Sequence, residues 1–193
     1  MKRTLLCSLL CLFCLQQAVA QPTPDQYERE IQEWMAREYP GYYLGLTAIL
    51  DRYDSLLVAH RVIPEASYTA YRALLLEVAE GRTQVPSLGF SIDRNLQALP
   101  WKNPLNDIRK ASFQILRDYY VPQTSRHACL YERIRRQEPD REPLTRQQVA
   151  RLMADTFREE DFRLLLVRKA VLRFLDPESP YIIYLYAGKP DTN

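Results

Sequence analysis

The sequence is short of the residues on which disulfide frameworks, metal sites and β-rich folds depend. Only four of its 193 residues are cysteine, two are histidine and five are glycine. So few glycines disfavour a fold of many short strands joined by tight turns. Beyond residue 20 there is no C-x-x-C or H-E-x-x-H spacing and no Walker A, G-x-S-x-G or G-x-G-x-x-G motif. We therefore expect neither a metal site nor a bound cofactor.

Long apolar runs are also missing, apart from one near the start. Basic residues 2–3 precede an apolar run over 4–15, and Ala18 and Ala20 form a small-x-small cleavage site. This pattern predicts a secretory signal peptide over 1–20. The run is shorter than the roughly 20 residues of a membrane-spanning helix. We expect the mature protein to begin at Gln21, to be exported to the periplasm or outside the cell, and to lack stable membrane insertion.

No net charge remains once the signal is removed. Without Lys2 and Arg3 the chain keeps 24 basic residues against 24 acidic ones, which gives no basis for nucleic-acid binding. We expect residues 21–193 to form a single domain, because a chain of this size buries about 70% of its unfolded surface. Only Cys129 follows the signal, so no disulfide can form within the mature chain. A free cysteine is usually buried, and we predict that for Cys129.

Proline, glycine and capping residues divide the chain into segments of helical length. We predict a mainly α-helical, bundle-like domain of six or seven helices. Three lie in the first half, over 23–38 with Thr23 as the cap, over 42–60 and over 64–80 with Gly81 behind it. In the second half we predict helices over 103–121 and 125–137, one opened by a capping box of Thr145 and Gln148, and a new one after a break near Arg158.

Two segments do not fit the helical pattern. Residues 82–103 have no helical period and predict a long loop, but their apolar side chains indicate that it packs on the helices. Residues 181–186 (YIIYLY) are β-branched and aromatic and predict a strand. A lone strand is unstable. We expect it to pair with 85–92, and pairing with another chain is the alternative.

Candidate catalytic groups are few. His127 and Cys129 stand two apart in a predicted helix, so their side chains point to different faces and cannot form a dyad. Asp51 and Asp54 share a helix face and could hold a cation, but we interpret them as part of a solvated surface. The acids at 159–161 are explained by the start of a helix.

The strongest charge feature is a set of arginines between 126 and 151: Arg126, Arg133, Arg135, Arg136, Arg141, Arg146 and Arg151. Arginine binds carboxylates through two hydrogen bonds and stacks on aromatic rings, so this set could dock an acidic partner or an anionic envelope polymer. A solvated face with interleaved acids is the simpler interpretation. The candidate binding residues are Arg126, Arg133, Arg135, Arg136, Trp101, Tyr181 and Tyr184.

The sequence therefore favours an exported helical protein that acts as a non-catalytic binding or assembly component of the cell envelope. Its partner would be a protein, or a second copy held through the C-terminal strand. Two other functions stay open. One is an enzyme whose dispersed active site lies near the 82–103 loop, and the other is a helical carrier of an apolar ligand.

Overall fold

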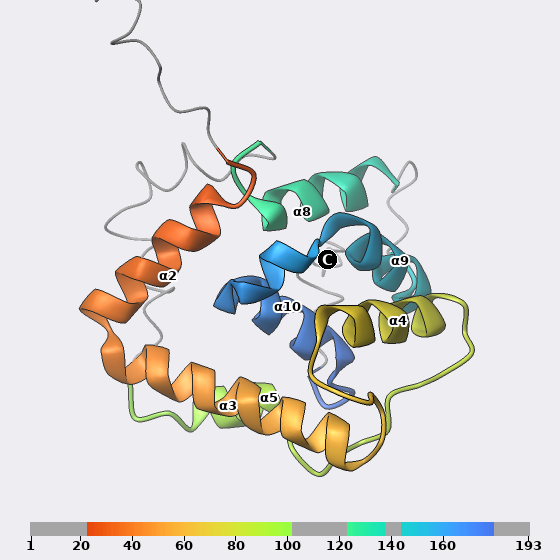
Figure 1. The fold of residues 1–193 in the computed structure, drawn as a ribbon, viewed down its shortest axis with the longest axis horizontal. Coiled ribbons are helices and arrows are strands. Elements are labelled where there is room, and N and C mark those ends of the chain that lie inside the picture. The colour runs from red at the N-terminus through yellow and green to blue at the C-terminus, as the bar shows by residue number, and fades with distance from the viewer. Residues whose placement is uncertain (1–22, 102–122, 138–143, 180–193) are drawn as a thin grey trace, which may run out of the picture.

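The computed structural model describes residues 23–101, 123–137 and 144–179, which are coloured in Figure 1. Within these ranges the chain forms seven α-helices and one 3-10 helix and no strand, which confirms the mainly helical prediction. The elements are α2 (Gln26–Glu38), α3 (Pro40–Ala59), α4 (Tyr68–Ala79), α5 (Ile92–Gln97), α8 (Arg126–Arg136), α9 (Arg146–Thr156), the 3-10 helix η1 (Glu159–Arg163) and α10 (Leu165–Leu175). The predicted signal peptide, the predicted helix over 103–121 and the predicted strand over 181–186 lie outside the described residues.

Helix α10 lies in the middle of the described fold (Figure 1). Nine of its eleven residues are buried. A helix that is apolar on most of its circumference needs cover on every side, and α2, α3 and η1 all contact α10, while α9 packs between α4 and α8. Each of the seven described α-helices contributes at least one of the largest fully buried side chains, which are Tyr53, Ile31, Met35, Leu46, Leu50, Leu57, Leu75, Ile92, Leu130, Ile134, Met153 and Leu172.

Several helix boundaries follow the capping residues that the sequence offers. The Ser125 hydroxyl accepts a hydrogen bond from the Ala128 amide and starts α8. Thr145 and Gln148 form both halves of the predicted capping box at α9. The predicted break near Arg158 is confirmed, because Phe157 and Arg158 are extended between α9 and η1. Gly81 follows α4 with a φ of +68°, a conformation that glycine adopts at little cost.

Replacing Thr145 with alanine is expected to lower the free energy of unfolding by about 1 kcal/mol, because the α9 amides lose their capping acceptor. Urea denaturation of the purified protein measures this change. The matched control is Thr145→Ser, which keeps the hydroxyl and should stay close to the wild type. An alanine variant as stable as the serine variant would contradict the capping role.

Three predicted helix starts are wrong by two to four residues. Helix α2 begins at Gln26, because the Thr23 carbonyl accepts the Gln26 amide in a turn and no side chain caps the helix. Helix α3 begins at Pro40, since proline is compatible with the first turn. Helix α4 begins at Tyr68, where the Ser67 hydroxyl accepts the Ala70 amide.

The 82–103 segment contains a helix that the sequence did not predict. Helix α5 has only six residues, too few to give a helical period, and Ser91 caps it by accepting the Arg94 amide. The expected packing of this segment is confirmed, since Val85, Leu88 and Ile92 are buried. The chain that follows α10 lies against it: Asp176 accepts the Ile92 amide at 2.8 Å, and the Ser87 hydroxyl donates to Glu178 at 2.6 Å.

Candidate functional site

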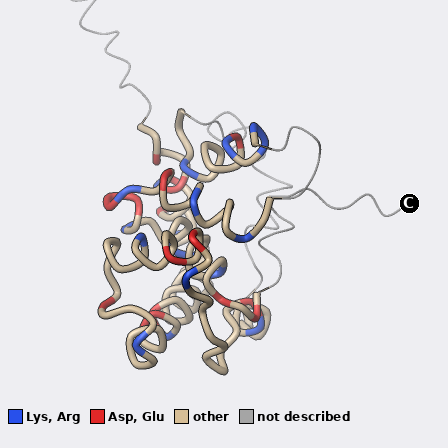
Figure 2. The backbone as a smooth tube through the Cα atoms, turned by 90° about the vertical axis from the view of Figure 1, so that its right-hand side faces the viewer, with Lys and Arg blue, Asp and Glu red and all other residues tan. Residues whose placement is uncertain are grey.

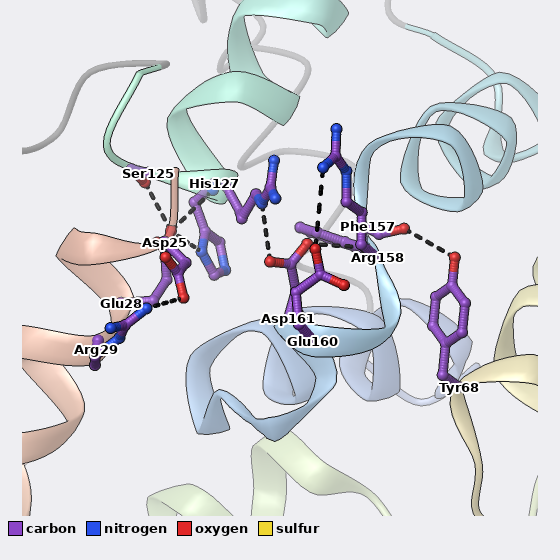
Figure 3. A network of polar contacts seen from close by, with 11 residues as sticks. Asp25, Glu28, Arg29, Tyr68, Ser125, His127, Phe157, Arg158, Glu160 and Asp161 are labelled. Carbon is purple, nitrogen blue, oxygen red and sulfur yellow. Dashed lines mark hydrogen bonds and ion pairs between the residues drawn. The ribbon is translucent and has the colours of Figure 1, made fainter. Parts of the chain in front are cut away.

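A buried carboxylate joins helix α2 to the start of α8 (Figure 3). Glu28 on α2 has no exposed surface. Its Oε1 accepts hydrogen bonds from the Ser125 hydroxyl at 2.7 Å, from the His127 amide at 3.0 Å and from His127 Nδ1 at 2.9 Å. Its Oε2 is buried and has no hydrogen-bond partner in the structure as described. These contacts hold together residues almost 100 positions apart.

The surroundings of Glu28 keep it ionised. Burial by itself raises the pKa of this carboxyl, but the hydrogen bonds and charge of His127 and the Ser125 hydroxyl outweigh burial, so the pKa falls below its ordinary value. The partial positive charge at the N-terminus of α8 acts in the same direction. Because an ionised carboxylate only accepts hydrogen bonds, Nδ1 of His127 carries the hydrogen. We call Glu28, Ser125 and His127 the α2–α8 latch.

A second buried pair lies beside the latch. Nε of Arg126 donates to Oδ1 of Asp161 at 2.9 Å, and the Arg158 amide donates to Oδ2 of the same carboxylate at 2.8 Å. Asp161 has no exposed surface, and burial raises its pKa above the ordinary range. The acids at 159–161 do start η1, as predicted. Asp161 additionally fastens α8 to η1, a contact that the sequence analysis missed.

Asp51 and Asp54 form an ion-pair cluster with α10, and the prediction of a solvated face is wrong for Asp54. Asp54 is buried, accepts the Tyr71 hydroxyl and pairs with Arg168 through Nε at 3.0 Å. Nη2 of Arg168 also lies 2.6 Å from Asp51. Burial raises the pKa of Asp54 in spite of these partners. Arg168 supplies the positive charge that offsets the two neighbouring carboxylates. The described residues contain no group of side chains suited to a metal ion.

The candidate arginines divide into inward and outward sets. Arg126 is buried against Asp161, and Nη1 of Arg133 donates to the Thr156 hydroxyl at 2.8 Å. Nη2 of Arg146 donates to the Phe174 carbonyl at 2.7 Å. Arg135 and Arg136 are exposed. The inward members stabilise the fold, so only part of the predicted arginine surface is available to a partner.

The outward set lies on the last two turns of α8. Tyr131 is 38% exposed, and the Arg135 guanidinium carbon lies 6.0 Å from the centre of its ring. Arg136 pairs with Glu132. Arg135 makes no ion pair with any carboxylate of the described residues. We call Tyr131, Glu132, Arg135 and Arg136 the outer face of α8.

Elsewhere, basic and acidic positions are interspersed over the described chain and do not separate into two sides (Figure 2). Arg151 follows this pattern and lies 3.3 Å from Glu80. Most of the charged surface that the structure describes is therefore an ordinary solvated one. The outer face of α8 differs from it because Arg135, which has no ion-pair partner among the described residues, lies beside an exposed aromatic ring.

The other candidate residues have separate surroundings. Trp101 is 54% exposed, and its indole lies so close to α3 that a Cβ at Gly41 would come within 2.6 Å of it. Cys129 is a free thiol that is only half-buried, so the prediction that it is buried is wrong. Arg141, Tyr181 and Tyr184 lie outside the described residues. Trp101 and the candidate arginines of α8 come from different segments, and the structure brings no pair of them into contact among the described residues.

One shallow pocket of about 250 Å³ lies between α4 and the turn before it, lined by residues that include Ile63, Pro64, Ala70 and Leu74. It contains none of the predicted site residues. No helix in the described ranges is long and apolar enough to cross a membrane. Comparison of the chain with family models, curated proteins and solved structures gives no match.

Proposed function

We propose that the chain is an exported helical protein that acts as a non-catalytic binding component of the cell envelope, and that the outer face of α8 docks an acidic protein partner. The proposal rests on the division of the arginines. Arg126 and Arg133 are occupied inside the fold, whereas Arg135 is exposed beside Tyr131 and has no carboxylate among the described residues. Arginine and tyrosine are, together with tryptophan, enriched among the residues that carry most of the binding energy at protein interfaces.

The outer face of α8 is also held in place before any partner arrives. The α2–α8 latch fixes the start of the helix, and the Arg133–Thr156 hydrogen bond fixes its last turns to α9. A rigid surface loses less conformational entropy on binding. An acidic segment would pair with Arg135 and Arg136 while an apolar side chain covers Tyr131. Charge complementarity therefore selects an acidic protein segment as the occupant.

The predicted strand over 181–186 has a separate, structural role in this proposal, namely pairing with the part of 85–92 that precedes the Ser91 cap of α5. The support is indirect. Asp176 and Glu178 contact Ile92 and Ser87 only a few residues before the run begins. Those contacts bring the end of the described chain to the segment with which we expect the strand to pair.

A labelled hexaglutamate peptide carrying one terminal tyrosine tests the docking surface, with fluorescence anisotropy as the measurement. We expect the double variant Arg135→Ala and Arg136→Ala to weaken binding about tenfold, because it removes both positive charges that would pair with the peptide. The matched control is Arg37→Ala with Arg94→Ala, which removes two exposed arginines from α2 and α5.

Three results would contradict the proposal. The first is equal weakening by both double variants, which would indicate general charge attraction. The second is an absence of peptide binding. The third is binding of an anionic polysaccharide in place of the peptide. Increasing salt should weaken the interaction, because exposed charges are screened within about 8 Å at physiological ionic strength.

A further inference from the structure

The shallow pocket beside α4 has an apolar floor. Residues 62–64, in the turn after α3, form one side of it, and Ala70, Ala73 and Leu74 on α4 form the other. Ala70 lies three and four residues before the other two, so all three share one face of the helix. Both sides include buried residues, namely Ile63, Ala70 and Leu74. Methylene groups gain free energy when they leave water for such a surface.

Two glutamates at the edge of this pocket have no partner among the described residues. Glu65 and Glu77 both line the pocket and both are exposed. Neither side chain forms an ion pair or a hydrogen bond within the part of the chain that the structure describes. No basic residue of the described ranges lines the pocket. The two carboxylates therefore give the pocket a negative charge that nothing in its lining offsets.

The two glutamates stand towards opposite ends of the floor. The Ser67 amide donates to the Glu65 carbonyl at 3.0 Å, which places Glu65 at the start of α4, whereas Glu77 lies in its third turn. Ser67 and Glu77 are separated by about 15 Å along the helix axis. Because helical side chains lean towards the N-terminus, Glu77 extends over the floor in the direction of Glu65. The pocket therefore has an apolar middle and an acidic group at each end.

The basic residues nearest in sequence do not neutralise these carboxylates. Arg72 is the only basic residue of α4, and its Nε donates to the Ala154 carbonyl on α9 at 3.3 Å. Arg61 precedes the residues that line the pocket and forms no ion pair with a described residue. Arg82, beyond α4, pairs with Glu80. Charge complementarity therefore favours a cationic ligand.

We propose that this pocket binds a linear aliphatic polyamine, a chain of methylene groups with protonated amines at its ends. The methylene groups cover Ala70, Ala73 and Leu74, while the ammonium groups pair with Glu65 and Glu77. A volume of about 250 Å³ is below the roughly 300 to 1,000 Å³ of pockets for drug-sized ligands, and it suits a slender chain. The site shares no residue with the outer face of α8 and is independent of it.

Spermidine is the probe, and amide NMR spectra of the isotope-labelled mature protein measure its binding. We expect signals from residues 62–77 to shift until the site is saturated. The double variant Glu65→Gln with Glu77→Gln should weaken binding about tenfold, because two exposed ion pairs are lost. The matched control is Glu33→Gln with Glu159→Gln, which removes two exposed carboxylates outside the pocket and should bind as the wild type does.

The variant Ala73→Leu separates the pocket from simple charge attraction. Ala73 is exposed, so leucine should leave folding intact, as circular dichroism verifies, but it fills the floor and should weaken binding while both carboxylates remain. The proposal is overturned if spermidine shifts no signal from 62–77, if both double variants weaken binding equally, or if Ala73→Leu binds as the wild type does. It is also overturned if dilysine amide, which carries the same charge as spermidine, binds more tightly, because the pocket would then belong to a protein partner.

Discussion

The variant Arg126→Met is expected to lower the free energy of unfolding by about 3 to 5 kcal/mol. Methionine keeps most of the apolar stem but removes the guanidinium that pairs with Asp161 at 2.9 Å. The Asp161 carboxylate would then be left in the interior with the Arg158 amide as its remaining hydrogen-bond donor. Breaking a buried ion pair from one side costs this much because the other charge stays desolvated. Urea denaturation at pH 7 gives the change in unfolding free energy.

The control is a double variant that removes both charges. Arg126→Met with Asp161→Asn leaves an amide oxygen to accept the Arg158 amide hydrogen and contains no buried charge at the site. We expect it to regain most of the stability that the single variant loses. A single variant that costs less than about 1 kcal/mol would show that Asp161 is not held in a desolvated site.

The variant Glu28→Gln is expected to lose about 2 kcal/mol at pH 7, because hydrogen bonds to a charged group become bonds to a neutral one. This loss should depend on pH. The folded-state pKa of Glu28 is below its ordinary value of 4.5, so its stabilising contribution is present above pH 4.5 and is lost as pH falls through the folded-state pKa. The stability difference between wild type and variant should therefore shrink in acid.

Two other acids affect the wild-type curve in the opposite sense. The pKa values of Asp54 and Asp161 are raised, so each stabilises the fold less as pH rises. Both residues remain in Glu28→Gln, so their effects cancel in the difference. Glu33→Gln is the matched control, because Glu33 is exposed on the same helix. A pH-independent difference for Glu28→Gln, or an equal pH dependence for Glu33→Gln, would contradict the latch.

Features encoded over a few residues could be predicted from the sequence. The Thr145–Gln148 capping box and the break near Arg158 each depend on side chains within three or four positions of the backbone groups that they bind. The same local logic gave the wrong start for α2. There a backbone turn at Thr23 competes with the side-chain cap, and the sequence does not show which of the two forms.

The buried charges could not be predicted in this way, because their partners are far away in the chain. Arg168 reaches Asp54 across 114 positions, and Glu28 binds Ser125 across 97. A partial signal was present all the same. Glu28 lies at the helical spacing of the buried Ile31 and Met35, so a charged residue stands within an apolar stripe. Such a position indicates a buried ion pair, although it does not identify the partner.

The docking of an acidic protein on the outer face of α8 is tested most directly by photo-cross-linking in the exporting cell. In one variant a photoreactive amino acid replaces Arg135. In a second variant of the same chain, which is the matched control, it replaces Arg94 on α5 instead. We expect position 135 to form an adduct whose cross-linked peptide maps to an acidic segment of one protein, and to lose it when Arg136→Glu is added. The account is contradicted if position 135 forms no protein adduct, if the adduct maps to a segment without acidic residues, or if position 94 gives the same adduct.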